Sequence, residues 1–258
     1  MPDLTYPTAL HARAAHAIAS AFGADPRVDT VLVSNSIARG RAVAESDLDM
    51  LVLGATDLDA AGVIGLEARW ADLVAHDADI LAYLASGSFA HVHLDVITGR
   101  YLPGVWDDGG GPDGFELEVG NHLAYAVPIT QAGPALQELR KRWLPFYDDG
   151  LRARRLAMVR QACLYDLDHV PFFLQRGLPF QAFDRLYKAQ QEFLQGLFIA
   201  RRVYALAYNK WIREQVVEWL DLPELFAQLT QLPALSDEIG QRRQAQALRD
   251  LAATCLIS

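Results

Sequence analysis

The chain has 258 residues, 52% of them apolar and 21% charged, which is typical of a folded globular protein of one large domain or two modest ones. Its formal net charge of −9 disfavours a nucleic-acid-binding protein, because binding to the phosphate backbone of a nucleic acid needs clustered Lys and Arg. The two cysteines form no metal-ligand or disulfide pattern, the N-terminus lacks the order of a signal peptide, and no apolar run has the length of a membrane span. We therefore expect a cytoplasmic protein with no membrane partner.

The first half of the chain alternates between helix and strand patterns. Apolar spacing and a plausible N-cap at Thr8 predict the first helix, and period-two alternation predicts a strand around Asp95. In chain order we expect a helix at 8–22, strands at 28–34 and 48–53, a helix at 63–76, and strands at 89–99 and 123–130. The tract "WDDGGGPDGFE" between the last two strands has the turn chemistry of a connecting loop; a flexible lid is the alternative.

The second half is helical in pattern. A helix begins near residue 134, "DDG" at 148–150 breaks it, and long helices punctuated by Pro171, Pro179 and Pro223 are expected from there to the end. We predict an α+β protein: an α/β domain with a mixed sheet over residues 1–148, followed by an all-helical bundle over 149–258.

Two carboxylates stand at the start of the predicted strand 48–53. Residues two apart on a strand face the same side, so Asp47 and Asp49 project together and repel each other unless a cation lies between them. Mg²⁺ prefers one or two carboxylates together with water and phosphate oxygens. Asp95, on a separate strand, offers a third carboxylate that could face the same side. A pair of solvated surface aspartates is the plain alternative.

A small polar turn lies upstream of this pair. Ser36 opens "SIARG", where small side chains and a glycine allow backbone N–H groups to approach a phosphate. Together the turn, the pair and the later acid resemble the signature of the nucleotidyltransferase superfamily, which has the polymerase-β-like fold. Ser36 matches the turn serine; Ala38, Arg39 and Gly40 match its extension; Ser46 to Asp49 match the Ser-Asp-x-Asp run; and Asp95 suits the third acid.

One residue departs from that pattern. Asn35 stands where the family has a glycine, at a position that needs φ > 0, and Asn is the next most tolerant residue there. The turn can therefore survive, although the Asn35 side chain now stands where backbone would approach the phosphates.

The two-part organisation resembles the antibiotic nucleotidyltransferases that act on aminoglycosides and lincosamides. The resemblance implies that a bundle lysine reaches the triphosphate, and Lys210, on an expected helix, is the first candidate; a surface lysine is the alternative. Lys188, Arg201 and Arg202 are weaker candidates, and Asp184 or Glu192 could bind an acceptor. Aromatic residues at helical spacing, among them Tyr204, Tyr208 and Trp211, are expected to be core. A zinc site on His91, His93 and Asp95 is a minority alternative.

The resemblance implies a Mg²⁺-dependent transfer of a nucleotidyl group, with ATP or another nucleoside triphosphate as co-substrate and a hydroxyl of a small molecule as acceptor. Asp47, Asp49 and Asp95 would be the catalytic and metal-binding residues, while Asn35, Ser36, Arg39, Gly40, Ser46 and Lys210 would bind the nucleotide. Protein nucleotidylation and a catalytically silent nucleotide-binding module are the alternatives. Nucleic acid is disfavoured as a partner, and a homodimer stays open.

Overall fold

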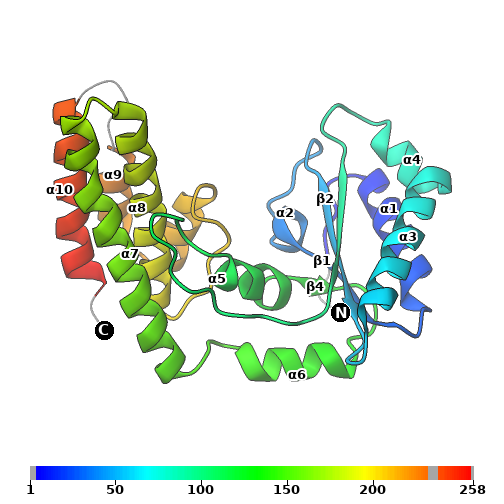
Figure 1. Cartoon of the computed structure of the whole chain (residues 1–258). Coiled ribbons are helices and arrows are strands. Elements are labelled where there is room, and N and C mark those ends of the chain that lie inside the picture. The colour runs from blue at the N-terminus through cyan, green and yellow to red at the C-terminus, as the bar shows by residue number, and fades with distance from the viewer. Residues whose placement is uncertain (1–3, 232–237, 257–258) are drawn as a thin grey trace. The chain divides into compact units, whose positions relative to one another are not determined.

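The computed structural model describes residues 4–231 and 238–256 and divides the chain into two compact units (Figure 1). The α/β unit comprises residues up to Tyr101 together with Val119–Pro145, and the helical unit comprises Leu102–Glu118 and the chain from Phe146 onward. The class is α+β: an N-terminal mixed sheet with helices, followed by a largely helical C-terminal region.

The α/β unit is built on a four-stranded sheet in the order β3-β2-β1-β4. The strands β1 (Val28–Val33) and β2 (Leu48–Gly54) are antiparallel, and β4 (Val127–Pro128) is antiparallel to β1. The strand β3 (Val92–Ile97) runs parallel to β2, which makes the sheet mixed. Strands β1 to β3 fall within the segments that the sequence predicts, whereas the expected strand at 123–130 is reduced to β4, and its first two residues belong to the π-helical turn η1 (Gly120–Ala124).

One face of the sheet carries the core of this unit. Every second residue of β2, at Leu48, Met50 and Val52, packs with three helices that cover this face (Figure 1). These helices are α1 (Ala9–Gly23), α3 (Ala60–His76) and α4 (Ala78–Leu84). Thr8 caps α1 as predicted, by accepting a hydrogen bond from the backbone N–H of His11. The helix α4 was not anticipated from the sequence; it is short, and the side chain of Asp77 caps it.

The short helix α2 (Asn35–Ala38) contacts β2, and the helix α6 (Pro134–Trp143) contacts β1 and β2. The N-cap of α6 is Gly133, which has no side chain to offer. Asp29 of β1 caps the helix instead, because its carboxylate accepts hydrogen bonds from the N–H groups of Ala135 at 2.8 Å and Leu136 at 3.0 Å. A strand residue therefore fixes where α6 begins.

The helical unit is organised around two long antiparallel helices, α7 (Asp149–Gln175) and α8 (Pro179–Ala200). The helix α10 (Glu238–Cys255) packs against both, and η2 (Glu214–Trp219) and α9 (Pro223–Thr230) complete the described part. Fully buried Leu167, Phe193, Leu197 and Phe198 lie at the centre of its core.

The segment 102–118, which includes the helix α5 (Phe115–Val119) up to Glu118, belongs to the helical unit rather than to the first half of the chain. Buried Arg155 of α7 holds it by binding the carboxylates of Glu116 and Asp113. The pKa of Asp113 is lowered, because these bonds to Arg155 outweigh the effect of burial. The structural division thus differs from the expected one at residue 148, because contacts distant in sequence decide it.

The chain after α8 is not the continuous helix that the aromatic spacing predicted. The helix α8 ends at Ala200, and Arg202 and Trp211 adopt positive φ values of 56° and 59°. The buried side chain of Gln215 stabilises the non-helical path: it accepts a hydrogen bond from the N–H of Leu206 and donates to the carbonyl of Ala207. Tyr204 and Tyr208 are buried, as expected, but on a loop, whereas Trp211, which was also expected in the core, is exposed.

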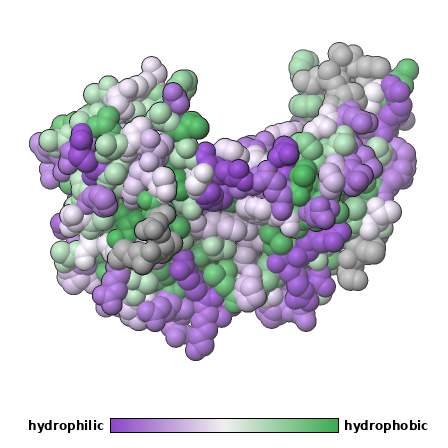
Figure 2. All heavy atoms as spheres, turned by 180° about the vertical axis from the view of Figure 1, so that it is seen from behind, coloured by the Kyte–Doolittle hydropathy of each residue, from purple (hydrophilic) through white to green (hydrophobic). Residues whose placement is uncertain are grey.

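On the face shown in Figure 2, hydrophilic side chains are distributed over both units, in keeping with a chain of which about a fifth is charged. Within residues 4–231 and 238–256, every helix is too short or too polar to cross a bilayer.

Candidate active site

The turn between β1 and α2 has the backbone conformation that its sequence predicts. Asn35 has a φ of +52°, in the left-handed region where glycine is most at ease and asparagine next. Gly40, at the other end of the turn segment, has a φ of +66°. The N–H of Ser34 donates to the carbonyl oxygen of Asp49 at 3.0 Å, so the turn is tied directly to the strand that carries the aspartates.

The hydroxyl of Ser36 is buried without a hydrogen-bond partner in the described structure. Buried hydroxyl groups are ordinarily hydrogen-bonded, and one that is not suggests a partner that binds from outside the chain. The first N–H groups of α2 also lack carbonyl partners within so short a helix. The Ser36 turn therefore presents donors for an anion of the size of a phosphate.

Asp47 stands between two anchored neighbours. The carbonyl oxygen of Ser46 accepts hydrogen bonds from Nε2 of His11 and from the hydroxyl of Tyr83, both at 2.9 Å. The N–H of Leu48 donates to the carbonyl of His91 at 2.9 Å. His11 comes from α1 and Tyr83 from α4, so helices on the core face hold the backbone at Asp47. Sequence reasoning missed both residues, because their partner is a backbone oxygen distant in sequence.

The hydroxyl of Ser46 has a structural role. It accepts a hydrogen bond from the N–H of Val43 at 2.9 Å and closes the turn before β2. Its predicted contact with the nucleotide stays a prediction.

Asp49 and Asp95 project from the same face of the sheet, opposite the core. In the parallel register of β2 and β3, Asp49 pairs with His93, and Asp95 pairs with Leu51. Side chains of paired residues share a face, and Leu48, Leu94 and their alternates occupy the core face. Strand spacing and rise place the Cα atoms of Asp49 and Asp95 roughly 8 Å apart. Asp47, two residues before Asp49, continues the same face.

The carboxylates suit a hard cation, but they do not form a closed cage. Within the described residues, no three His, Cys, Asp or Glu side chains are grouped closely enough to hold a metal ion. This holds for the zinc alternative at His91, His93 and Asp95 and equally for a site with Asp47, Asp49 and Asp95 as three joint ligands. Mg²⁺ needs fewer protein ligands than such a group provides, since it commonly binds one or two carboxylates and fills its other coordination positions with water and substrate phosphates. Asp47 and Asp49 fit that donor set.

The negative charges of Asp47 and Asp49 both act on the neighbouring side chain of Tyr83. Burial first, and then the negative charge of both aspartates, raises the pKa of Tyr83 to about 12. The titratable ring of His93 lies beside the pair, with its Nε2 3.5 Å from Oδ2 of Asp47. The two aspartates together are therefore placed to attract a divalent cation.

His122 of η1 joins this face. Burial lowers the pKa of its imidazole, an effect that the charge of Asp95 partly opposes, so the ring is largely neutral at pH 7. The hydroxyl of Tyr101 lies 3.5 Å from Nδ1 of His122. Arg39, at the end of α2, is electrostatically coupled to Tyr125, whose pKa is raised by burial and lowered less by Arg39. Tyr125 comes from the segment 123–130 that the sequence assigned to a strand, His122 lies directly before it, and no motif marked either residue.

The candidate residues of the second half belong to the helical unit. Lys210 lies on the loop held by Gln215, not on a helix, and its predicted contact with the triphosphate stays a prediction. Lys188 pairs with Asp184 at 2.9 Å, and Arg202 pairs with Asp149. Among the candidate nucleotide-binding residues of the helical unit, Lys188 and Arg202 are therefore already paired with carboxylates.

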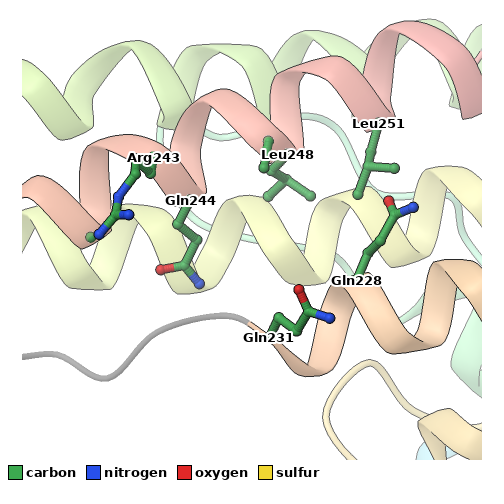
Figure 3. A pocket seen from close by; sticks show the side chains of 8 residues that line it. Gln228, Gln231, Arg243, Gln244, Leu248 and Leu251 are labelled. Atoms are coloured by element: carbon green, nitrogen blue, oxygen red, sulfur yellow. The ribbon is translucent and has the colours of Figure 1, made fainter.

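A cavity of about 560 Å³ lies between α9 and α10 (Figure 3). Gln228 of α9 and Gln231, which follows α9, face Gln244, Leu248 and Leu251 of α10 across it. Its described lining contains amides, apolar groups and Arg243 but no carboxylate or nucleophile, so it offers no counterpart to the chemistry of the sheet face.

Comparison with known proteins assigns no family. No protein-family model matches the chain, and a search of curated proteins finds no match. The functional argument therefore depends on the geometry of the sheet face and its turn.

Proposed function

We propose that this chain is a Mg²⁺-dependent nucleotidyltransferase with a polymerase-β-like catalytic unit, which moves a nucleotidyl group, by preference AMP, from a nucleoside triphosphate to a hydroxyl of a small molecule and releases pyrophosphate. The observation that carries the proposal is the combination of Asp47, Asp49 and Asp95 on one sheet face with the left-handed turn at Asn35. A turn with donors beside paired carboxylates suits a magnesium-bound triphosphate.

Each residue has a distinct role in this proposal. Asp47 and Asp49 would hold Mg²⁺, and the bound ion would supply positive charge that neutralises the phosphates. The Ser36 hydroxyl and the N–H groups of α2 bind phosphate oxygens. Asp95 accepts the proton of the acceptor hydroxyl as that oxygen attacks the α-phosphorus, and pyrophosphate leaves. His122, neutral and electrostatically coupled to Asp95, is a second group able to take that proton.

The acceptor class follows from charge and from resemblance. An acidic protein attracts cationic, polyhydroxylated molecules such as aminoglycosides. The two-part organisation resembles enzymes that modify such antibiotics, and supports a resistance-like activity on that ground.

The test is pyrophosphate release from each of the four nucleoside triphosphates, measured with Mg²⁺ over a panel of aminoglycosides, lincosamides and other hydroxylated amines. We expect release with at least one pair and a loss of about 100-fold or more in Asp49→Asn. The matched control is Asp57→Asn, an exposed aspartate in the turn after β2, which should keep full activity. Transfer of label to a protein instead would favour protein nucleotidylation. Equal rates in Asp49→Asn and wild type would refute the proposed site.

A further inference from the structure

A second group of residues lies inside the helical unit around Glu192, which the sequence analysis offered only as a possible acceptor-binding acid. Glu192 of α8 is 1% exposed, and neither of its carboxyl oxygens has a hydrogen-bond partner in the described structure. It lines a cavity of about 180 Å³ together with residues of α7 and the loop 105–113. A fully buried carboxyl group with both oxygens free is uncommon, and it points to a partner that binds there.

The loop over this cavity is held close to α8. A Cβ atom at Gly109 would collide with Nη1 of Arg185, and one at Gly111 would lie 3.3 Å from the side chain of Lys188. Both glycines have positive φ, of 73° and 87°. The glycines therefore allow close approach as well as a left-handed path. With Asp113 bound to Arg155, the tract is a fixed wall of the cavity, which disfavours the alternative of a flexible lid.

The cavity wall combines acids with apolar surface. Val159 and Ala162 of α7 and the indole of Trp106 supply apolar area, while Asp107, Asp113 and Glu192 supply carboxylates. The amide of Gln195, which follows Glu192 by nearly one helical turn, already donates to Glu116 and Asp113. The carboxyl group of Glu192 is thus left without a donor from the described part of this wall.

We propose that this cavity binds a small organic cation, an alkylammonium group whose N–H donors satisfy the two free oxygens of Glu192 and whose carbon chain contacts Trp106 and the apolar residues of α7. An ammonium group supplies three donors, and an aromatic ring is a favourable neighbour for its charge. A strongly hydrated divalent ion suits the apolar part of the wall less well. The site lies wholly within the helical unit and does not depend on the proposed nucleotide transfer.

Binding should release a proton near neutral pH. Burial, and then the charge of Asp166, raises the pKa of Glu192 to about 8, against the opposing effects of Arg185 and Lys188. A cation favours the ionised form, so its binding at pH 7 displaces the proton of the carboxyl group. Affinity should then rise up to about tenfold per pH unit between pH 6 and 8 and level off above.

Several other titratable and charged groups lie around Glu192, and burial raises the pKa of one of them, Asp166, against the opposing effect of Arg185. Asp107 and Asp113 lie on the loop, and Asp166 accepts a hydrogen bond from Arg185. Burial first raises the pKa of the Cys163 thiol on α7, and the charge of Glu192 raises it further; Arg249 of α10 opposes this. The Cys163 thiol therefore stays protonated from pH 6 to 8.

The experiment is titration calorimetry of the whole protein with n-propylammonium chloride, in two buffers of different ionisation enthalpy, at pH 6, 7, 8 and 9. We expect binding in the millimolar range, proton release that declines from pH 7 to pH 9, and at least tenfold weaker binding of the neutral isostere n-propanol. Glu192→Gln keeps the shape of the side chain and should lose at least tenfold in affinity, while Glu224→Gln on the exposed surface of α9 should lose none.

Three results would overturn the proposal: no binding of propylammonium to the wild type, equal binding of propanol, or unchanged affinity in Glu192→Gln. If Glu192→Gln failed to fold, the buffer dependence in the wild type would still decide, since a heat that is independent of the buffer excludes Glu192 as the anchoring group.

Discussion

At the scale of single residues, Asn35 shows how far a local rule reaches. It stands where the family that the sequence resembles has a glycine, which predicted a left-handed backbone, and its φ is +52°. The same rule gave no indication of His11, Tyr83 or His122. These residues act through carbonyl oxygens or charges that are distant in sequence, and only the folded chain brings them near the aspartates.

The conformation of Asn35 leads to a stability prediction. Asn35→Ala should lower the free energy of unfolding by about 1 kcal/mol, because a Cβ without a polar group tolerates positive φ poorly. Asn35→Gly should leave it unchanged or raise it slightly, since glycine adopts this region without strain. Urea denaturation followed by circular dichroism measures both. Equal losses in the two variants would show that the asparagine side chain, not the backbone, matters here.

At the scale of elements, the periodic segments were predictable and their ends less so. Apolar runs at 28–34 and 48–53 located β1 and β2 to within one residue at either end. Alternation in "FAHVHLDVITG" located β3 to within three residues, because a sheet with one buried face imposes a period of two. The segment 123–130 was mistaken for a full strand, and 201–211 for a helix. In the second case side-chain hydrogen bonds from Gln215 replace the helical pattern, and spacing cannot reveal them.

The cap of α6 gives a prediction at this scale. Asp29→Ala should lower the free energy of unfolding by about 1 kcal/mol, because the N–H groups of Ala135 and Leu136 lose their acceptor. Asp29→Asn, which keeps one acceptor oxygen, should lose less. Thermal unfolding of the two variants beside the wild type is the measurement. If Asp29→Ala were as stable as the wild type, water would be replacing the carboxylate at no cost.

At the scale of the whole molecule, the change from alternating helix and strand patterns to purely helical patterns along the sequence correctly indicated a mixed α/β half followed by a helical half. The assignment of segment 102–118 to the helical unit could not be read from the sequence, because it depends on Arg155 pairing with Asp113 and Glu116 about forty residues away. The candidate site was recognisable because its carboxylates and turn lie in one short stretch. The acidic cavity of the helical unit has no such local signature.

The acceptor is the open element of the proposed reaction, so the most direct test of the central claim is one that needs no acceptor. We would titrate the protein with a non-hydrolysable ATP analogue by calorimetry, once with Mg²⁺ and once with excess chelator, in the wild type, Asp49→Asn and Asp57→Asn. The account predicts binding that requires Mg²⁺, that weakens at least tenfold in Asp49→Asn, and that is unchanged in Asp57→Asn. Equal binding with and without Mg²⁺, or full affinity in Asp49→Asn, would contradict it.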